Sequence, residues 1–170
     1  MTDKLTIRPE KERDIKQINI VIESAFKNHP YSNQTEHLLV SDLRDNDALS
    51  ISLVAVTNQI IVGHIAFSEI SINRDHQNWY GLAPVSVTPD YQNQGIGSAL
   101  ITEGLDQLKS LGANGCVLVG EPNFYKQFGF HHHDKLFCDG IPKKYFLVKS
   151  FNHHPPSGEI TYHRTFSTYN

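Results

Sequence analysis

Apolar residues recur along this chain with two different spacings, which predict both helices and strands. Helical spacing covers residues 15–25 and 93–110, and a shorter helix is expected over 35–44, with Thr35 as its N-cap. Strands are predicted at residues 5–8, 50–56, 60–72, 80–87, 115–119, 136–138 and 145–148, with a last one around 160–162. Residues 74–78 are polar and favour a loop, and residues 122–128 favour a short helix.

The order of these elements predicts the fold class. Asn58-Gln59 marks a tight turn, so the strands on either side of it should form an antiparallel hairpin. The strand at 115–119 is apolar on both faces and is expected at the centre of the sheet. Mixed pairing with helices on both faces is an α/β (α+β) layer arrangement. We expect one domain over residues 1–170, a length sufficient to bury a sizeable core.

The stretch Gln92-Asn93-Gln94-Gly95-Ile96-Gly97 joins a predicted strand to the longest predicted helix. The first turn of a helix has backbone N–H groups without acceptors, and the glycines let an anion approach them. The stretch is not a P-loop, because no lysine follows the glycines. It is not a dinucleotide fingerprint either, because Leu100 stands where the third glycine belongs. The alternative is a plain connection whose glycines only relieve backbone strain.

This turn, together with the strand residues before it, resembles motif A of the GNAT superfamily of acyl-CoA N-acyltransferases. The resemblance implies acetyl-CoA as co-substrate and a mixed, mostly antiparallel central sheet with a splayed strand pair. The coenzyme pyrophosphate would be held by Gln92, Asn93, Gln94, Gly95, Ile96, Gly97 and Ser98, and the pantetheine arm by Val85, Ser86 and Val87. Many relatives carry Arg or Lys at the places of Asn93 or Gln94, which this chain lacks. Lys126 is a candidate for the missing charge, or a solvated lysine.

A second stretch, Tyr125-Lys126-Gln127-Phe128-Gly129-Phe130, resembles the Tyr-x-x-x-Gly-Phe ending of motif B in the same family. The resemblance implies that Tyr125 protonates the leaving thiolate. A phenol of pKa about 10 holds its proton at neutral pH and suits that task. A ring packed in the core is the alternative, and both roles can coexist. The form of this stretch, and the later Ile141-Pro142-x-x-Tyr145-Phe146, are most similar to the YhbS-type bacterial acetyltransferases.

The attacking amine must lose a proton, and Glu69, His64 and Glu121 are the candidate bases. Glu69 is preferred because its strand should lie beside the acceptor side of the cleft, whereas strand alternation sends His64 to the opposite face. An exposed carboxylate without a role, or a water chain, is the alternative. Trp79 and Tyr80 are candidate residues of the acceptor pocket, or simply packing.

These observations together predict an N-acetyltransferase that moves an acetyl group from acetyl-CoA to a primary amine of a small molecule or peptide by direct attack. An acyl-CoA-binding or sensing module with little or no turnover is the alternative. The two differ in whether the thioester is consumed in the presence of amines.

Composition limits the partners, the compartment and the metal content that we expect for this protein. A net charge of -3 gives no support for a nucleic-acid or membrane-surface partner. No apolar run reaches the ~20 residues of a membrane span, and the first residues lack the apolar centre of a signal peptide. Cys116 and Cys138 do not make a disulfide framework, so a cytoplasmic location is expected. A monomer or homodimer is expected. At most two of His131-His132-His133 could share a site, and no metal is expected.

Overall fold

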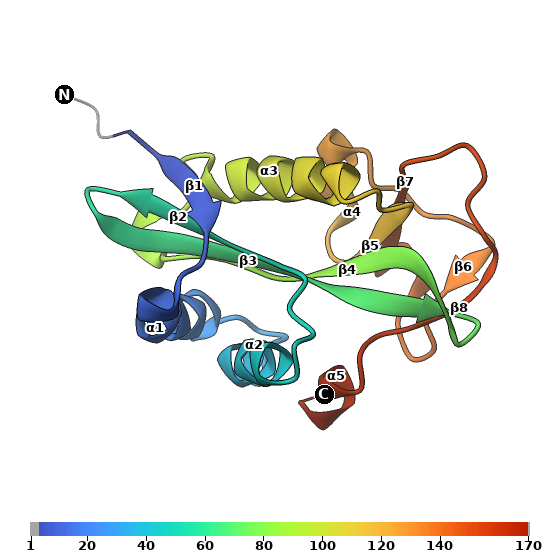
Figure 1. Ribbon diagram of the computed structural model, residues 1–170, viewed down its shortest axis with the longest axis horizontal. Helices are drawn as coiled ribbons and strands as arrows, with labels where there is room; N and C mark the ends of the chain where they lie inside the picture. Colours follow the sequence, from blue (N-terminus) through green and yellow to red (C-terminus); the bar gives the residue numbers. More distant parts are fainter. Residues whose placement is uncertain (1–3, 170) are drawn as a thin grey trace.

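The computed structural model describes residues 4–169 and is built around one extended sheet (Figure 1). The strand order is β1-β2-β3-β4-β5-β7, with β8 joined to the far end of β3 and to β6. Neighbours are antiparallel except β4–β5 and β6–β8, which confirms the predicted mixed, mostly antiparallel sheet. The strands are β1 (Thr6–Pro9), β2 (Ile51–Thr57), β3 (Ile60–Ile72), β4 (Asp75–Val87), β5 (Gly115–Val119), β6 (Leu136–Phe137), β7 (Phe146–Ser150) and β8 (Gly158–Thr161).

Helices cover both faces of the sheet, as predicted. In Figure 1, α3 and α4 lie above it, and α1, α2 and α5 lie below. The helices are α1 (Ile15–Phe26), α2 (Glu36–Asp45), α3 (Ile96–Ser110), α4 (Pro122–Tyr125) and α5 (Thr165–Thr168). Short 3-10 turns are η1 (Glu12–Asp14), η2 (Pro89–Tyr91), η3 (Lys126–Phe128) and η4 (Lys143–Tyr145). None of the described helices is long and apolar enough to cross a bilayer.

The structure corrects two predicted boundaries and one predicted capping interaction. Residues 74–78 are not a loop: Asn73 and Arg74, both with positive φ, make a two-residue turn, and β4 begins at Asp75 opposite Ile72. Helix α3 begins at Ile96 rather than Asn93, because Asn93 and Gly95 both adopt positive φ. Thr35 occupies the N-cap position of α2 as predicted, but its side chain makes no capping hydrogen bond.

Apolar packing differs between the two faces. The α3 face carries one large cluster, in which Ile65, Phe67, Leu82, Cys116 and Leu118 of the sheet meet the apolar side of α3. The opposite face carries two separate clusters. One lies beneath α1 and α2, and the other lies beneath β6 and β8.

The neighbouring strands β4 and β5 separate along part of their length. β4 pairs with β5 only where Trp79, Tyr80 and Gly81 face Gly115, Cys116 and Val117. From Leu82 onward β4 pairs only with β3, and a bulge at Ala83-Pro84 places three steps of β4 opposite two of β3. The predicted splayed pair is therefore present, and Gly81 and Val117 stand at its vertex.

Candidate coenzyme site and active site

The free edge of β4 in the splay exposes backbone groups. Thr88 N–H donates to the Val62 carbonyl at 2.9 Å, and hydrogen-bonded positions alternate along an antiparallel pair. Ser86 therefore bonds to β3, while the N–H and C=O groups of Val85 and Val87 point away from β3 into the splay. The Val87 carbonyl is taken by the Gln92 side-chain amide at 2.9 Å. The N–H and C=O groups of Val85 and the N–H of Val87 remain available to hydrogen-bond an extended ligand that carries amides.

The glycine turn presents further donors. Gly95 is the N-cap of α3, with φ 83°, and its carbonyl accepts from Ala99 N–H at 3.0 Å. The N–H groups of Ile96, Gly97 and Ser98 precede that first helical bond and have no intrahelical acceptor. A Cβ built on Gly95 meets nothing within 4 Å, and one on Gly97 meets only Val87, at 3.8 Å. An anion can therefore approach these donors closely.

A hollow of about 320 Å³ joins the β4 edge to this turn. Its lining is Val85, Val87, Tyr91, Gln92, Asn93, Gly95, Ile96, Gly97, Ser98, Ile101 and Phe124. All but two of the predicted coenzyme residues line it. The side chain of Ser86 is buried on the opposite face of the sheet, next to His64, and the side-chain amide of Gln94 donates to the Asp90 carbonyl at 3.3 Å.

Sequence reasoning missed three residues of this lining: Tyr91, Ile101 and Phe124. Phe124 comes from α4, which lies far from the glycine turn in sequence. Its ring packs edge-on against Tyr125, 4.9 Å between centroids. Local pattern carries no signal for such a contact, because it depends on how α4 docks against α3.

No lysine or arginine is among the residues that line the hollow. Gln92 and Gln94 brace the loop through their side-chain amides, so backbone N–H groups are the main donors left. Lys126 does not supply the missing charge within the hollow. It lines a different hollow on the other side of α4, together with Lys143 and Lys144.

Tyr125 is seated at the end of β5. A Cβ on Gly120 would overlap the Tyr125 ring, so only glycine lets the ring lie over the strand there. Phe124 and Phe130 contact the other sides of the ring. Burial raises the pKa of the Tyr125 phenol to about 12, so it keeps its proton throughout the neutral range. The ring is therefore packed and its phenol is protonated, while its role in protonating the leaving thiolate stays a prediction.

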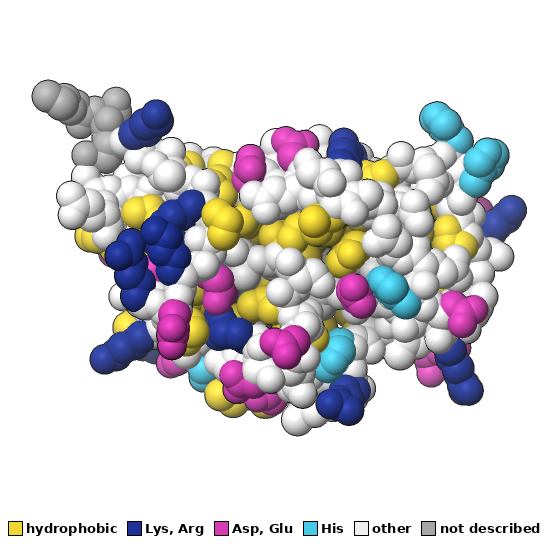
Figure 2. All heavy atoms as spheres, in the orientation of Figure 1, with side chains coloured by type: hydrophobic (Ala, Val, Ile, Leu, Met, Phe, Trp, Pro, Cys, Tyr) yellow, Lys and Arg dark blue, Asp and Glu magenta, His cyan; other side chains and the backbone are white. Residues whose placement is uncertain are grey.

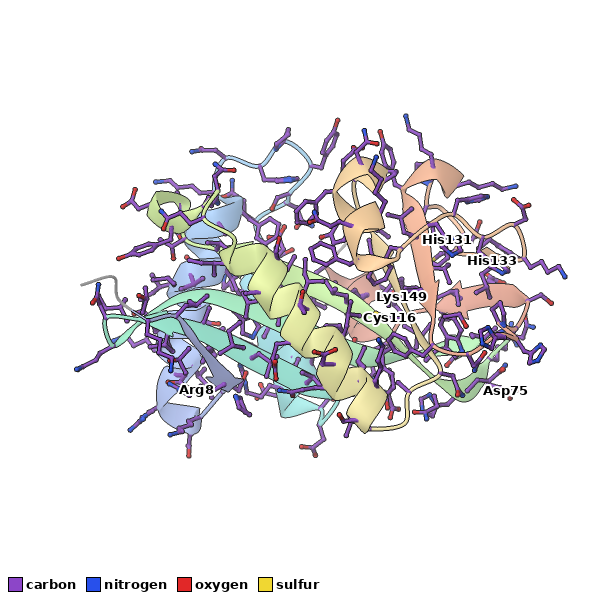
Figure 3. All side chains as sticks on the ribbon, turned by 90° about the horizontal axis from the view of Figure 1, so that it is seen from above. Arg8, Asp75, Cys116, His131, His133 and Lys149 are labelled. Atoms are coloured by element: carbon purple, nitrogen blue, oxygen red, sulfur yellow. The ribbon has the colours of Figure 1, made fainter. Side chains whose placement is uncertain are left out.

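Lys149 fixes the turn that follows Tyr125. Its Nζ donates to the Phe128 carbonyl at 2.6 Å, at the end of η3. Gly129 has φ 89°, and a Cβ on it would lie 2.5 Å from Nζ, so the glycine of the motif makes room for this lysine. Figure 3 shows Lys149 beside Cys116, its register partner on β5. This hydrogen bond ties the segment that carries Tyr125 to the edge strand β7.

The candidate bases lie in different surroundings. Glu69 pairs across the strands with Tyr80 on the side of β4 away from β5, so β4 separates it from the splay. Its side chain is 56% exposed, and its carboxylate lies 3.5 Å from His76 Nε2. Glu121 is exposed at the start of α4. The general-base role of Glu69 stays a prediction, and its position on β3 leaves β4 between its carboxylate and the splay.

His64 belongs to a buried polar network on the face opposite α3. Its Nε2 lies 2.8 Å from Ser52 Oγ, which also bonds to Glu10. Arg44 pairs with the same carboxylate through two hydrogen bonds of 2.8 and 2.9 Å. Burial lowers the pKa of His64 to about 4, so the imidazole is neutral in the folded protein near pH 7.

Trp79 and Tyr80 are packing residues rather than the lining of a pocket. The Trp79 ring fills the space where Gly115 lacks a Cβ, and the Tyr80 hydroxyl donates to Asn78 Oδ1 at 3.1 Å. His132 lies 3.1 Å from Asp134, and no group of three His, Cys, Asp or Glu side chains that could hold a metal is found within residues 4–169.

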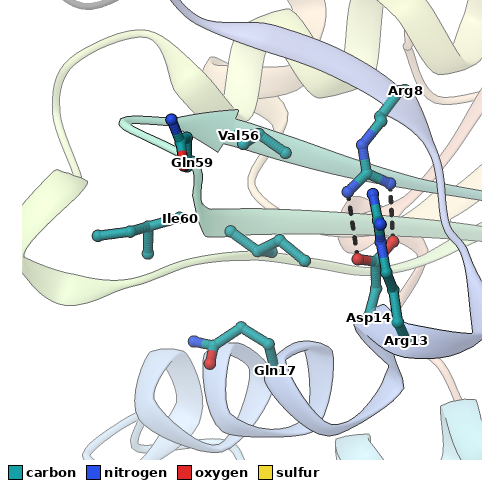
Figure 4. Close-up of a pocket in the computed structure, with 8 residues that line it drawn as sticks. Arg8, Arg13, Asp14, Gln17, Val56, Gln59 and Ile60 are labelled. Carbon is teal, nitrogen blue, oxygen red and sulfur yellow. Dashed lines mark hydrogen bonds and ion pairs between the residues drawn. The ribbon is translucent and has the colours of Figure 1, made fainter.

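A larger hollow, about 630 Å³, lies on the face of the sheet that α1 covers, opposite α3 (Figure 4). Arg8, Arg13 and Gln17 line it, with the tip of the β2–β3 hairpin. Figure 2 shows Lys and Arg side chains gathered on this side, near β1 and α1. Arg8 holds Asp14 at 2.7 and 3.1 Å, which keeps the pKa of that carboxyl below its usual range. This hollow shares no residue with the one beside the glycine turn.

Comparison with known proteins agrees with this geometry. The Acetyltransferase (GNAT) family profile matches residues 16–130. An Escherichia coli protein named Uncharacterized N-acetyltransferase YhbS is 34% identical over 134 residues, 76% of this chain and 77% of its own.

Two solved structures carry the coenzyme. A GNAT family acetyltransferase from Brucella melitensis in complex with acetyl-CoA is 42% identical, with a TM-score of 0.87 over 96% of this chain and 98% of its own. E. coli YhbS in complex with CoA is 29% identical, with a TM-score of 0.91 over 100% of this chain and 96% of its own. With this fold, splay and glycine turn, the chain belongs to the GNAT family of acetyltransferases.

Proposed function

We propose that this protein transfers an acetyl group from acetyl-CoA to a primary amine of a small molecule or peptide by direct attack. The observation that carries the proposal is the free backbone edge of Val85 and Val87, which leads from the donors of the glycine turn to the vertex of the splay. The related structures that hold acetyl-CoA and CoA support the same ligand here.

The length of the edge suits the coenzyme. From Val87 to Leu82 the strand spans roughly 16 Å at about 3.3 Å per residue. With the pyrophosphate at Ile96, Gly97 and Ser98, the pantetheine amides lie along Val85 and Val87, as an added strand would. The thioester then reaches the vertex, where a free N–H of the β4 edge polarises its carbonyl and stabilises the oxyanion.

The chemical step needs one proton lost and one gained. The amine nitrogen forms a bond to the thioester carbon, the C–S bond breaks, the nitrogen releases a proton and the thiolate takes one up. Tyr125 donates a hydrogen bond to the sulfur as negative charge develops there, and protonates it as the coenzyme leaves. Glu69 could receive the amine proton only through water, because β4 stands between it and the splay.

A thiol-release assay tests the proposal. Acetyl-CoA is offered with polyamines, amino acids, aminoglycosides and peptides with free N-termini, and the acetylated product is identified by mass spectrometry. We expect thiol release that depends on one class of amine. Thermal stabilisation by acetyl-CoA without thiol release would instead favour a binding or sensing module. At 100 times Kd the coenzyme should add about 2.7 kcal/mol to the free energy of unfolding, and no shift at millimolar coenzyme would contradict both.

A further inference from the structure

A tyrosine from the C-terminal part of the chain occupies the vertex of the splay on the face opposite α3. A Cβ built on Gly81 would lie 2.6 Å from Cε1 and 3.2 Å from Cδ1 of Tyr162, so the ring lies directly on the Gly81 backbone. Tyr80 and Leu82, the neighbours of Gly81, pack in the α3 cluster, so the absent side chain of Gly81 faces the other way. Gly81 is also the last residue of β4 that pairs with β5.

The chain holds this ring firmly but leaves its hydroxyl free. β8 pairs with the end of β3 through Thr161 and Ser71, which fixes the backbone next to Tyr162. The Phe166 ring packs against it, 4.9 Å between centroids. The side chain packs against the apolar cluster beneath β6 and β8, with its phenol near Cys138, so the phenol is more buried than the residue as a whole. Its hydroxyl makes no hydrogen bond with any other residue in the range 4–169.

A second hydroxyl at the vertex also has no partner. Ser68 lies directly across from Gly81 on β3, and residues opposite each other in an antiparallel pair place their side chains on the same face. Ser68 is 1% exposed, and its Oγ has no hydrogen-bond partner among the described residues. Buried hydroxyls are normally satisfied by protein, water or ligand. The vertex therefore has unused hydrogen-bonding groups on the face that the coenzyme hollow does not occupy.

We propose that the Tyr162 hydroxyl binds the attacking amine and aims it at the thioester, an inference that rests on the proposed function. The coenzyme enters along the α3 face, so an amine reaches the thioester carbon from the opposite face, where Tyr162 stands. The phenol oxygen accepts an N–H of the amine, which leaves the nitrogen lone pair directed at the carbonyl carbon. Burial raises the pKa of the Tyr162 phenol, so its O–H stays available to water or Ser68.

Replacing Tyr162 by Phe tests the proposal, because the ring stays and the hydroxyl goes. With the best amine of the thiol-release panel, kcat/KM for the amine should fall about tenfold, the effect of one hydrogen bond to substrate. The Kd of acetyl-CoA, measured by calorimetry, and the melting temperature should not change. Tyr80→Phe is the matched control: it removes a hydroxyl from the other face one residue from Gly81, and should leave kcat/KM unchanged. Amine kinetics within about twofold of wild type in Tyr162→Phe, or an equal loss in Tyr80→Phe, would overturn the proposal.

A crystal structure with acetyl-CoA gives a test that needs no acceptor. An attack distance of about 3.3 Å and a hydrogen bond of about 3 Å place Tyr162 Oη no more than about 6.5 Å from the thioester carbon. A longer distance in the complex excludes the role. If no amine in the panel is acetylated, the proposed function fails, while this distance still decides whether Tyr162 faces the reacting group.

Discussion

The two faces of the sheet differ in the polar groups that they offer: mainly backbone amides on the α3 face, and buried polar side chains on the other. On the α3 face one continuous apolar cluster supports a hollow whose polar groups are mainly backbone amides. On the opposite face two apolar clusters flank polar side chains, among them His64, Ser68 and Ser86, which are all buried. Backbone donors suit a ligand that every member of a family shares. Side-chain groups suit a partner that differs from one member to the next, which agrees with the proposal that the acceptor binds on this face.

The largest effect we expect comes from filling the hollow on the α3 face. Gly97→Glu places a side chain and a negative charge beside the donors of the turn, so acetyl-CoA affinity should fall at least about 100-fold by calorimetry. The fold should persist, since a Cβ at Gly97 meets only Val87 at 3.8 Å. Thr102→Glu puts the same charge on an exposed site of α3 and should bind normally. Normal acetyl-CoA affinity in folded Gly97→Glu would show that the turn only connects β4 to α3 and does not bind the coenzyme.

A smaller effect is expected at Tyr125. Tyr125→Phe keeps the packed ring and removes the proton donor, so kcat should drop at least about 100-fold while Kd and melting temperature hold. The phenol has a pKa raised to about 12, so the wild-type rate should not decline from its ionisation until the pH approaches 12. A loss of stability with kcat per folded molecule unchanged would make the hydroxyl structural only.

The buried imidazole on the other face predicts acid sensitivity. The pKa of His64 is about 4 in the folded protein, below its ordinary value of 6.5. Between these two pH values the imidazole is protonated in the unfolded chain but stays neutral in the folded protein. Stability from this group is complete above pH 6.5 and falls as the pH drops to about 4, by about 3 kcal/mol. Urea unfolding at a series of pH values measures this loss.

Two variants separate His64 from the other titrating groups. His64→Gln should flatten the decline in unfolding free energy between pH 6.5 and 4, the window set by the two pKa values. His76→Gln, at an exposed position, should leave the decline as it is in wild type. An unchanged pH dependence in His64→Gln would show that carboxyl groups, rather than His64, dominate the loss of stability at low pH.

The smallest effect is expected at Glu69. Because β4 stands between this carboxylate and the splay, Glu69→Gln should change kcat by no more than about threefold. A hundredfold drop in kcat, with Kd for acetyl-CoA unchanged, would restore Glu69 as the general base and show that a water path crosses β4. The measurement is steady-state kinetics with the same amine used for Tyr125→Phe.

The coenzyme side was predictable because its determinants are local. The glycine turn, the strand before it and the helix after it are contiguous, so spacing alone pointed to the turn at Gly95 and Gly97, where the N–H groups of Ile96, Gly97 and Ser98 lack intrahelical acceptors. The tyrosine motif was equally local, and Gly129 proved to make room for Lys149. The misplaced loop at 74–78 shows the limit of polarity as a guide, since Asn73 and Arg74 form a turn that lets polar residues pair as strand.

The opposite face was not predictable in the same way. Arg44, Ser52 and His64 come from α2, β2 and β3, and Glu10 comes from the segment between β1 and η1, so only the folded sheet brings them together. Tyr162 reaches Gly81 because β8 joins the end of β3, a pairing that no turn or spacing signals. Glu69 was preferred because its strand was expected beside the acceptor side of the cleft, and alternation set His64 aside; neither argument shows that β4 lies between Glu69 and the splay.

The position of Tyr162 late in the chain also limits when each face of the sheet can be completed during translation. Every residue that lines the coenzyme hollow lies before Tyr125 in the chain and leaves the ribosome before Tyr162 does. The nascent chain can therefore form the glycine turn before the Tyr162 ring covers the Gly81 backbone. Only when β8 pairs with β3 can the Tyr162 ring cover the Gly81 backbone, so the face that we propose for the acceptor is the last to be completed.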